Sequence, residues 1–184
     1  MKTGIVAAVR DRRSWHWHPA DRSRLEASAE TAAVQLLREG EVVALPTETV
    51  YGLAADALNP IAVAKIFDAK ERPRFDPLIV HLPDDSWLER VAKIDNASRA
   101  RINDLIAKFW PGPLTLVLDR QAIVPEIVTA GLDTVAVRMS SQPVFAEIIA
   151  AFGKPLAAPS ANRFGRISPT TAQHVFHEIG RAHV

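Results

Sequence analysis

Short apolar runs alternate with amphipathic helical segments along most of this sequence, and this alternation restricts the possible folds more than any other feature. Strand-like runs lie at residues 41–45, 77–82, 114–118, 134–139 and 155–159, and helical segments at 26–39, 60–70, 98–109, 143–152 and 171–179. Strands that alternate with helices form a sheet covered by helices, so we predict an α/β fold in one domain. Residues 1–25 show no clear period, and we expect an N-terminal extension over 1–25 followed by the domain over 26–184.

Composition and charge exclude several classes of protein. Of the 184 residues, 48% are hydrophobic and 23% are charged, and the formal net charge is +1. This balance is typical of a folded domain with a sizeable core, and it gives no general attraction to nucleic acid or membrane. The chain has no cysteine, which excludes thiolate catalysis and fits a reducing cytoplasmic location. No apolar run approaches the roughly 18 residues of a membrane span, so we expect no membrane partner.

Two of the predicted helices have recognisable ends. Asn59 followed by Pro60 is a favourable helix start, and Pro73 disfavours helix in the residue before it, so this helix should end near Lys70 to Arg72. The earlier helix should stop at Gly40. We expect their apolar faces to consist of Ala32, Leu36 and Leu37 in the first helix, and of Ile61, Ala64, Ile66 and Phe67 in the second.

Polar side chains follow the ends of several predicted strands or lie beside them. They comprise hydroxyls (Thr47, Thr49, Ser160), an amide (Asn162), an imidazole (His81) and cations (Lys70, Arg72, Arg138). Because open α/β sheets bind ligands at strand ends, we expect these groups to converge in one cleft. Such a set is rich in cations and poor in free carboxylates. It therefore suits an anionic ligand, above all a phosphate.

Each of these features also has a purely structural interpretation. A Lys-x-Arg sequence at a helix end usually complements the helix dipole, and a hydroxyl pair in a turn is usually a cap. A histidine at a strand end is more often a hydrogen-bonded structural residue. Two further pairs, His16 with His18 and His174 with His177, fall short of a coordination set, so we predict no metal site on the protein. The sequence has no Walker A motif and no G-x-G-x-x-G, so a nucleotide would bind by another route.

Five segments together resemble the Sua5/YrdC/YciO family in order and spacing: LPTETVYGLAADA, IFDAKERPRFDPLIVHL, FWPGPLTLVL, VAVRM and APSANRFGRISPTTAQHV. The resemblance covers about residues 29–184 and is greatest to the bacterial threonylcarbamoyl-AMP synthases. It implies a twisted mixed sheet with flanking helices around a large concave cavity, the YrdC/RibB-like fold. The implied activity is a nucleotidyl transfer that joins L-threonine, bicarbonate and ATP into threonylcarbamoyl-AMP and pyrophosphate. This reaction begins the formation of threonylcarbamoyladenosine next to the anticodon of tRNA.

Carried over position by position, the resemblance implies two neighbouring subsites. The ATP site would comprise Lys70, Arg72, Thr115, Ser160 and Asn162, with Lys70 and Arg72 of the K-x-R motif also serving as the catalytic pair. The threonine site would comprise Thr47, Tyr51, His81 and Arg138, with Arg138 on the carboxylate of the amino acid. Thr115 would lie between the amino acid and the nucleotide.

The resemblance also implies partners. Mg²⁺ is expected with ATP, RNA or tRNA in the basic cavity is a possible further partner, and a separate threonylcarbamoyl-transferase complex would use the product. The alternative from another class is an RNA-binding or ribosome-associated module without synthase activity. The presence of both the K-x-R and the S-x-N motif favours the enzyme. A carbamoyl-transferring domain of a hydrogenase-maturation protein is a third possibility, but such domains lie in much larger chains with zinc-finger-like segments.

The sequence departs from the family pattern at several positions. Ser140, Ser141 and Gln142 replace the usual Pro-x-His or Pro-x-Asp, Phe164 replaces a small residue, and Asp76 replaces the usual Asn. The family continues after its last helix into another strand and a G-x-E-S-T motif that helps to cover the nucleotide, whereas this sequence ends at GRAHV. We therefore expect a C-terminally truncated domain that binds ATP more weakly than an extended version.

Overall fold

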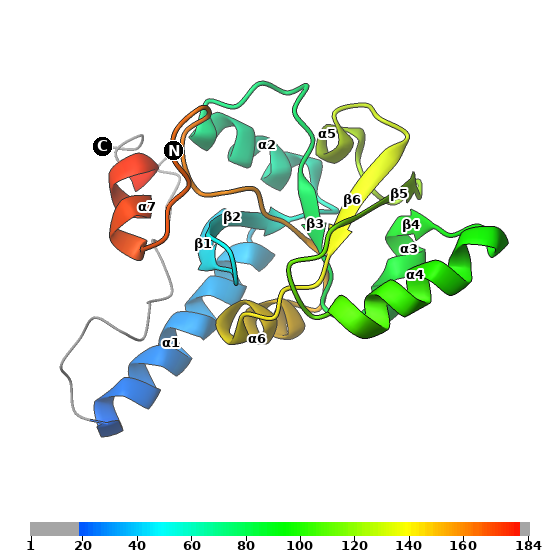
Figure 1. Cartoon of the computed structure of the whole chain (residues 1–184). Coiled ribbons are helices and arrows are strands. Elements are labelled where there is room, and N and C mark those ends of the chain that lie inside the picture. Colours follow the sequence, from blue (N-terminus) through cyan, green and yellow to red (C-terminus); the bar gives the residue numbers. More distant parts are fainter. Residues whose placement is uncertain (1–18, 181–184) are drawn as a thin grey trace.

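The computed structural model describes residues 19–180, with side chains described from residue 29 (Figure 1). Seven strands form one mixed sheet in the order β1-β2-β7-β3-β6-β5-β4, with helices on both faces. The strands are β1 (Val43–Pro46), β2 (Tyr51–Asp56), β3 (Ile79–His81), β4 (Ala92–Lys93), β5 (Leu116–Arg120), β6 (Thr134–Arg138) and β7 (Leu156–Ala157). β3 pairs with β6 in parallel, and the other strand pairs described are antiparallel. The predicted α/β class is confirmed.

The helices agree with most of the predicted segments. They are α1 (Pro19–Arg38), α2 (Pro60–Lys70), the 3-10 turn η1 (Asp85–Trp87), α3 (Leu88–Val91), α4 (Asn96–Phe109), α5 (Glu126–Thr129), α6 (Pro143–Phe152) and α7 (Ala172–Glu178). α1 begins at Pro19, so the predicted helix start at Glu26 was wrong. The assignment of residues 1–25 to a separate extension stays a prediction. Within the described part of the chain, no helix is long and apolar enough to cross a membrane.

Local signals set both ends of α2 and the C-terminal end of the α1 region where the sequence predicts them. The Asn59 side chain accepts hydrogen bonds from the backbone N–H groups of Ile61 at 3.0 Å and Ala62 at 3.3 Å, which caps α2. At the other end of α2, Glu71 has a φ of 51° and turns the chain out of the helix. Gly40 ends the α1 region with a φ of 74°, a conformation that favours glycine.

The sheet separates two apolar cores. α1 and α6 pack together on one face, as Figure 1 shows, and α2 and α5 lie on the other. The predicted apolar faces were partly wrong, because Ala32 is exposed and Ile61 is 73% exposed. The buried faces are instead formed by Ala33, Val34 and Leu37 in α1, and by Ala62, Val63, Ile66 and Phe67 in α2.

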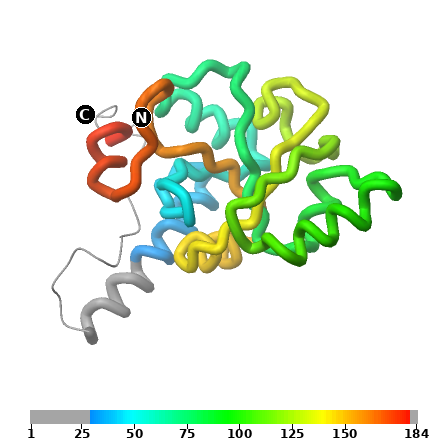
Figure 2. Tube along the Cα trace, viewed as in Figure 1, coloured from blue at the N-terminus to red at the C-terminus, as the bar shows by residue number. Residues whose placement is uncertain are grey.

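The chain after α6 crosses the molecule and brings the S-x-N segment to β2, a path that Figure 2 traces in orange. The β2 residues Tyr51 and Leu53 carry its backbone contacts. The N–H of Leu53 donates to Pro159 at 2.8 Å, and the N–H of Ala161 donates to Tyr51 at 2.7 Å. Tyr51 also donates its N–H to Pro169 at 2.8 Å. β2 therefore holds both ends of the loop at residues 160–170.

Candidate functional site

The first group of polar side chains, which we call the arginine centre, comprises Glu48, Thr49, His81, Arg138 and Ser140. His81 and Arg138 are register partners at the ends of the parallel strands β3 and β6, so the strand pairing places them side by side. The turn at residues 47–50 joins β1 to β2 and carries Glu48 toward Arg138. Three separate segments of the chain thus meet at this point.

Glu48 connects Arg138 and Ser140 within the arginine centre by accepting hydrogen bonds from both. Its Oε1 atom accepts hydrogen bonds from Arg138 Nε at 3.0 Å and Nη2 at 2.5 Å. Its other oxygen, Oε2, accepts a short hydrogen bond from the Ser140 hydroxyl. Thr49 Oγ1 lies 3.4 Å from Arg138 Nη2. The guanidinium and the carboxylate therefore neutralise each other, with only 9% and 16% of their side chains exposed.

Burial and neighbouring charges fix the protonation states of this centre. Burial raises the pKa of Glu48, but hydrogen bonds from Ser140 and Arg138 outweigh it and hold that pKa below its ordinary value. Burial lowers the pKa of His81 to about 3, and the Arg138 charge acts in the same direction. The His81 ring is 2% exposed, and its Nδ1 has no hydrogen-bond partner in the described chain. His81 is therefore a neutral imidazole near neutral pH.

The other predicted threonine-site residues have different surroundings. Thr47 Oγ1 donates to the Val50 carbonyl at 2.6 Å and accepts from the Thr49 and Val50 N–H groups at 3.2 Å, so it caps its own turn. This is the structural role that hydroxyls in turns usually have. Tyr51 is buried at the start of β2, on the core face shared with α2. Thr115, which was predicted for the ATP site, is half-buried just before β5.

The second group, which we call the lysine centre, comprises Lys70, Arg72, Asp76, Ser160 and Asn162. Lys70 lies at the end of α2 and is only 1% exposed. Its ammonium group donates to the carbonyl of Ser160 and, at 2.5 Å, to that of Asn162. The K-x-R and S-x-N motifs, about 90 residues apart, are thus in direct contact. The loop at 160–170 folds over Lys70, so two protein carbonyls already accept hydrogen bonds from its ammonium group.

Arg72 and Asn162 complete the lysine centre. Arg72 Nη2 lies 2.8 Å from Asp76 Oδ2, and the same guanidinium donates to the Asp76 and Pro77 carbonyls at 3.3 and 3.1 Å. The Asn162 amide donates to Arg163 and Arg166 carbonyls at 2.8 and 2.7 Å, while its buried Oδ1 has no partner in the described chain.

The charge of the lysine centre differs from that of the arginine centre. Lys70 and Arg72 contribute two positive charges and Asp76 one negative charge, so the formal sum is +1. Burial lowers the pKa of Lys70 from 10.5 to about 8; the Arg72 charge adds to this effect and Asp76 opposes it. At neutral pH the lysine is mostly protonated. The centre therefore keeps a positive charge to offer an anionic ligand.

Sequence reasoning missed Glu48 as a site residue, and it treated Ser140 and Asp76 only as departures from a pattern. Glu48 lies between the two threonines of the turn, so its place beside Thr47 and Thr49 was the available signal. Its partners come from β6 and the segment after it, about 90 residues away. Such a contact cannot be read from local sequence.

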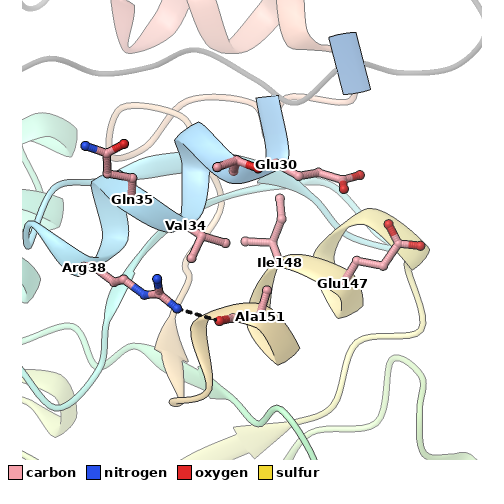
Figure 3. Close-up of a pocket in the computed structure, with 8 residues that line it drawn as sticks. Glu30, Val34, Gln35, Arg38, Glu147, Ile148 and Ala151 are labelled. Carbon is pink, nitrogen blue, oxygen red and sulfur yellow. Dashed lines mark hydrogen bonds between the residues drawn. The ribbon is translucent and has the colours of Figure 1, made fainter. Parts of the chain in front are cut away.

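The remaining candidates lie elsewhere. His174 and His177 are exposed on α7, where Gln173 lies 3.0 Å from the His177 ring, and His16 and His18 lie outside the described residues. No group of three or more potential metal-ligating side chains occurs in the described part of the chain. A hollow of about 540 Å³ lies between α1 and α6, as Figure 3 shows, with Arg38 donating to the Ala151 carbonyl at 3.1 Å. It contains no residue of either centre.

Comparison with known proteins places this chain in a family. Residues 35–183 match the profile of Sua5, YciO and YrdC, which carries the description "Telomere recombination". The chain belongs to the Sua5/YrdC/YciO family. A member from Bacillus subtilis, named threonylcarbamoyl-AMP synthase, is 51% identical over 149 residues, which are 80% of this chain and 42% of the relative. One of the same name from Vibrio vulnificus is 35% identical over 147 residues, covering 80% of this chain and 78% of the relative.

A solved structure of a family member supports the fold. The crystal structure of Pyrococcus abyssi Sua5 complexed with L-threonine has a TM-score of 0.80 and 46% identity, covering 84% of this chain and 45% of that one. The chain spans less than half the length of the Bacillus and Pyrococcus relatives. The twisted mixed sheet with flanking helices predicted from the sequence is the fold of this family.

Proposed function

We propose that this chain is an L-threonylcarbamoyladenylate synthase, an enzyme of the nucleotidyltransferase class that joins L-threonine, bicarbonate and ATP and releases pyrophosphate. Relatives with the name threonylcarbamoyl-AMP synthase, one of them matched over 78% of its length, support this function. The Pyrococcus relative has been solved with L-threonine bound. These likenesses favour the synthase over an RNA-binding module.

The observation that carries the proposal is the direct contact between the K-x-R and S-x-N motifs. Lys70 donates to the carbonyls of Ser160 and Asn162, so two segments assigned to ATP by resemblance form one positively charged centre. An ammonium group has three N–H donors, and these carbonyls use two of them. The third would reach a phosphate oxygen once the covering loop at 160–170 shifts, with the Arg72 guanidinium beside it and Thr115 toward the amino acid.

The arginine centre would hold L-threonine. Arg138 offers a planar guanidinium suited to a carboxylate, and the neutral His81 and the hydroxyl of Thr49 adjoin it. Tyr51 would line the pocket from the start of β2, and Thr47 would act by fixing the turn that carries Glu48.

The chemistry needs positive charge and orientation more than a covalent nucleophile. The threonine amine and bicarbonate form a carbamate with loss of water, and a carbamate oxygen then attacks the α-phosphate of ATP and displaces pyrophosphate. Both reactants are anions, so their approach is favoured by cations fixed in position. Lys70 and Arg72 would supply this charge. Mg²⁺ would arrive on the ATP phosphates, since magnesium usually keeps its waters and binds through few protein carboxylates.

The product would pass to a separate threonylcarbamoyl-transferase complex that modifies tRNA, in the cytoplasm. The domain that performs the synthesis is proposed to span residues 26–184. Direct contact with RNA or tRNA would be a secondary property of the same basic region.

Pyrophosphate release tests the proposal. We expect release from ATP that depends on both L-threonine and bicarbonate, with threonine most effective, serine intermediate and valine least, because a site that hydrogen-bonds a hydroxyl is left with unpaired groups when the hydroxyl is absent. Lys70→Met should greatly reduce this release, because the variant loses a contact proposed for ATP. Release that ignores threonine, together with tight binding of RNA, would favour the RNA-binding module.

A further inference from the structure

The arginine centre is electrically balanced, and this limits what it can bind. Arg138 carries the positive charge, Glu48 carries the negative charge, and the two are joined by hydrogen bonds of 3.0 and 2.5 Å. His81 faces this pair as a neutral ring. Ser140 and Thr49 add only hydroxyls. The sum over the centre is therefore zero.

A ligand with only a carboxylate fits this centre poorly. Such an anion on Arg138 would place two carboxylates around one partly buried guanidinium, and one negative charge would lack a counter-charge. Uncompensated charges out of water are costly. A free α-amino acid avoids this cost, because its ammonium group lies next to its carboxylate and would offset the charge of Glu48.

The donors of Arg138 leave room for this arrangement. A guanidinium has five N–H groups on three nitrogens. Glu48 engages Nε and Nη2 through one oxygen, and Nη1 has no partner in the described part of the chain. A carboxylate that binds along the Nη1 side would lie next to Glu48, and its α-ammonium would face the Glu48 oxygens.

We propose that Glu48 determines specificity by receiving the ammonium group of an α-amino acid whose carboxylate is held by Arg138. This inference rests on the proposed threonine site and adds to it a residue that recognises the positive charge of the substrate's ammonium group. Ser140 orients Glu48 through its hydrogen bond to Oε2. The centre thus selects the zwitterion over molecules that carry only one of its two charges.

Calorimetric titration of the wild-type chain with three matched ligands tests the inference. L-Threonine has both charges, (R)-3-hydroxybutyrate lacks the ammonium group, and L-threoninamide lacks the carboxylate. Loss of one charge-assisted contact should weaken binding about ten- to a hundredfold, so both analogues should bind at least about tenfold more weakly than threonine. Equal binding of threonine and (R)-3-hydroxybutyrate would overturn this inference but would not contradict the proposed threonine site.

The Glu48→Gln variant provides a second, independent test of the inference. It keeps the shape and one hydrogen-bonding oxygen but removes the charge, so threonine should bind about tenfold more weakly while (R)-3-hydroxybutyrate binds as well as before or better. Glu41→Gln is the matched control, because it also removes a carboxylate from an ion pair, with Lys65 at 2.8 Å, away from the arginine centre. It should leave the preference for threonine unchanged.

The outcomes separate the two proposals. An unchanged preference in Glu48→Gln, or tighter binding of both ligands, would show that Glu48 does not receive the ammonium group. No binding of threonine by the wild type would contradict the proposed function and this inference together. If circular dichroism shows that Glu48→Gln is unfolded, the three wild-type titrations decide the inference alone.

Discussion

The lysine centre and the arginine centre each bury a cation, but they balance it in different ways. Lys70 is surrounded by the carbonyl oxygens of Ser160 and Asn162, which are dipoles without net charge. Arg138 is paired with the carboxylate of Glu48. The first arrangement leaves the positive charge in place, and the second cancels it.

The charge balance of each centre determines which ligand suits it. A buried cation held by neutral carbonyls is still a favourable partner for a polyanion such as the phosphates of ATP. A cation that already has a carboxylate suits a ligand that brings both charges, as an amino acid does. The proposed assignment of the nucleotide to the lysine centre and of the amino acid to the arginine centre therefore agrees with the charge balance of the two centres.

Replacement of Lys70 by Met should produce the largest change and should affect only one centre. ATP should bind about a hundredfold more weakly, because a charge-assisted phosphate contact is lost and the loop that carries Ser160 loses its anchor. Threonine affinity should change by less than about twofold, because the described hydrogen bonds of Lys70 reach no residue of the arginine centre. Calorimetric titration with each ligand measures both, and Lys154→Met, at an exposed lysine, is the control. Unchanged ATP affinity in the Lys70 variant would show that the lysine centre does not bind the nucleotide.

Replacement of Arg138 by Lys should produce the reverse pattern. Lysine keeps the charge but cannot form the planar fork, so threonine should bind about tenfold more weakly. ATP affinity should stay near the wild-type value. If this variant weakens ATP binding as much as threonine binding, the two centres act as one. The assignment of one ligand to each centre by charge balance would then be wrong.

The pH dependence should also separate the centres. Because the folded pKa of Lys70 is about 8, its positive charge is present below that pH and is lost above it. ATP affinity should therefore decrease as pH rises through about 8, by at most tenfold per pH unit for one proton. His81, with a pKa of about 3, stays neutral, so threonine affinity should show no step near its ordinary pKa of 6.5. Lys70→Met should remove the decrease in ATP affinity near pH 8. A change in threonine affinity near pH 6.5 would contradict a buried, neutral His81.

Replacement of Ser140 by Ala should give the smallest effect. The variant removes one hydrogen bond to Glu48 while leaving the ion pair with Arg138 intact, so threonine affinity should decrease about threefold. Titration with threonine measures this, and Ser141→Ala, at the next position, serves as the comparison. A loss as large as that of Arg138→Lys would mean that Ser140 contacts the ligand itself.

Local signals made much of the fold predictable. Asn59, Gly40 and Pro73 act on the few residues beside them, so the helix ends could be placed from sequence. β2 was missed, because the run YGLAAD has no alternation and only pairing with β1 and β7 makes it a strand. The start of α1 was missed for lack of an apolar period before residue 26.

The site was predictable in its residue types but not in its pairing. Lys70, Arg138 and His81 were found because they lie at the ends of predictable elements. Ser160 was placed beside Lys70 only through the family resemblance, and Glu48 was missed, since each lies about 90 residues from the cation it contacts. The balance of charge, which distinguishes the two centres, is therefore a property of the tertiary structure.

A crystal structure of this chain with L-threonine and a non-hydrolysable ATP analogue would show directly which ligand each centre holds. We expect the threonine carboxylate on Arg138 with its ammonium group on Glu48, and the phosphates beside Lys70 and Arg72. Phosphates bound at Arg138, or a threonine carboxylate that has displaced Glu48 from Arg138, would contradict this expectation.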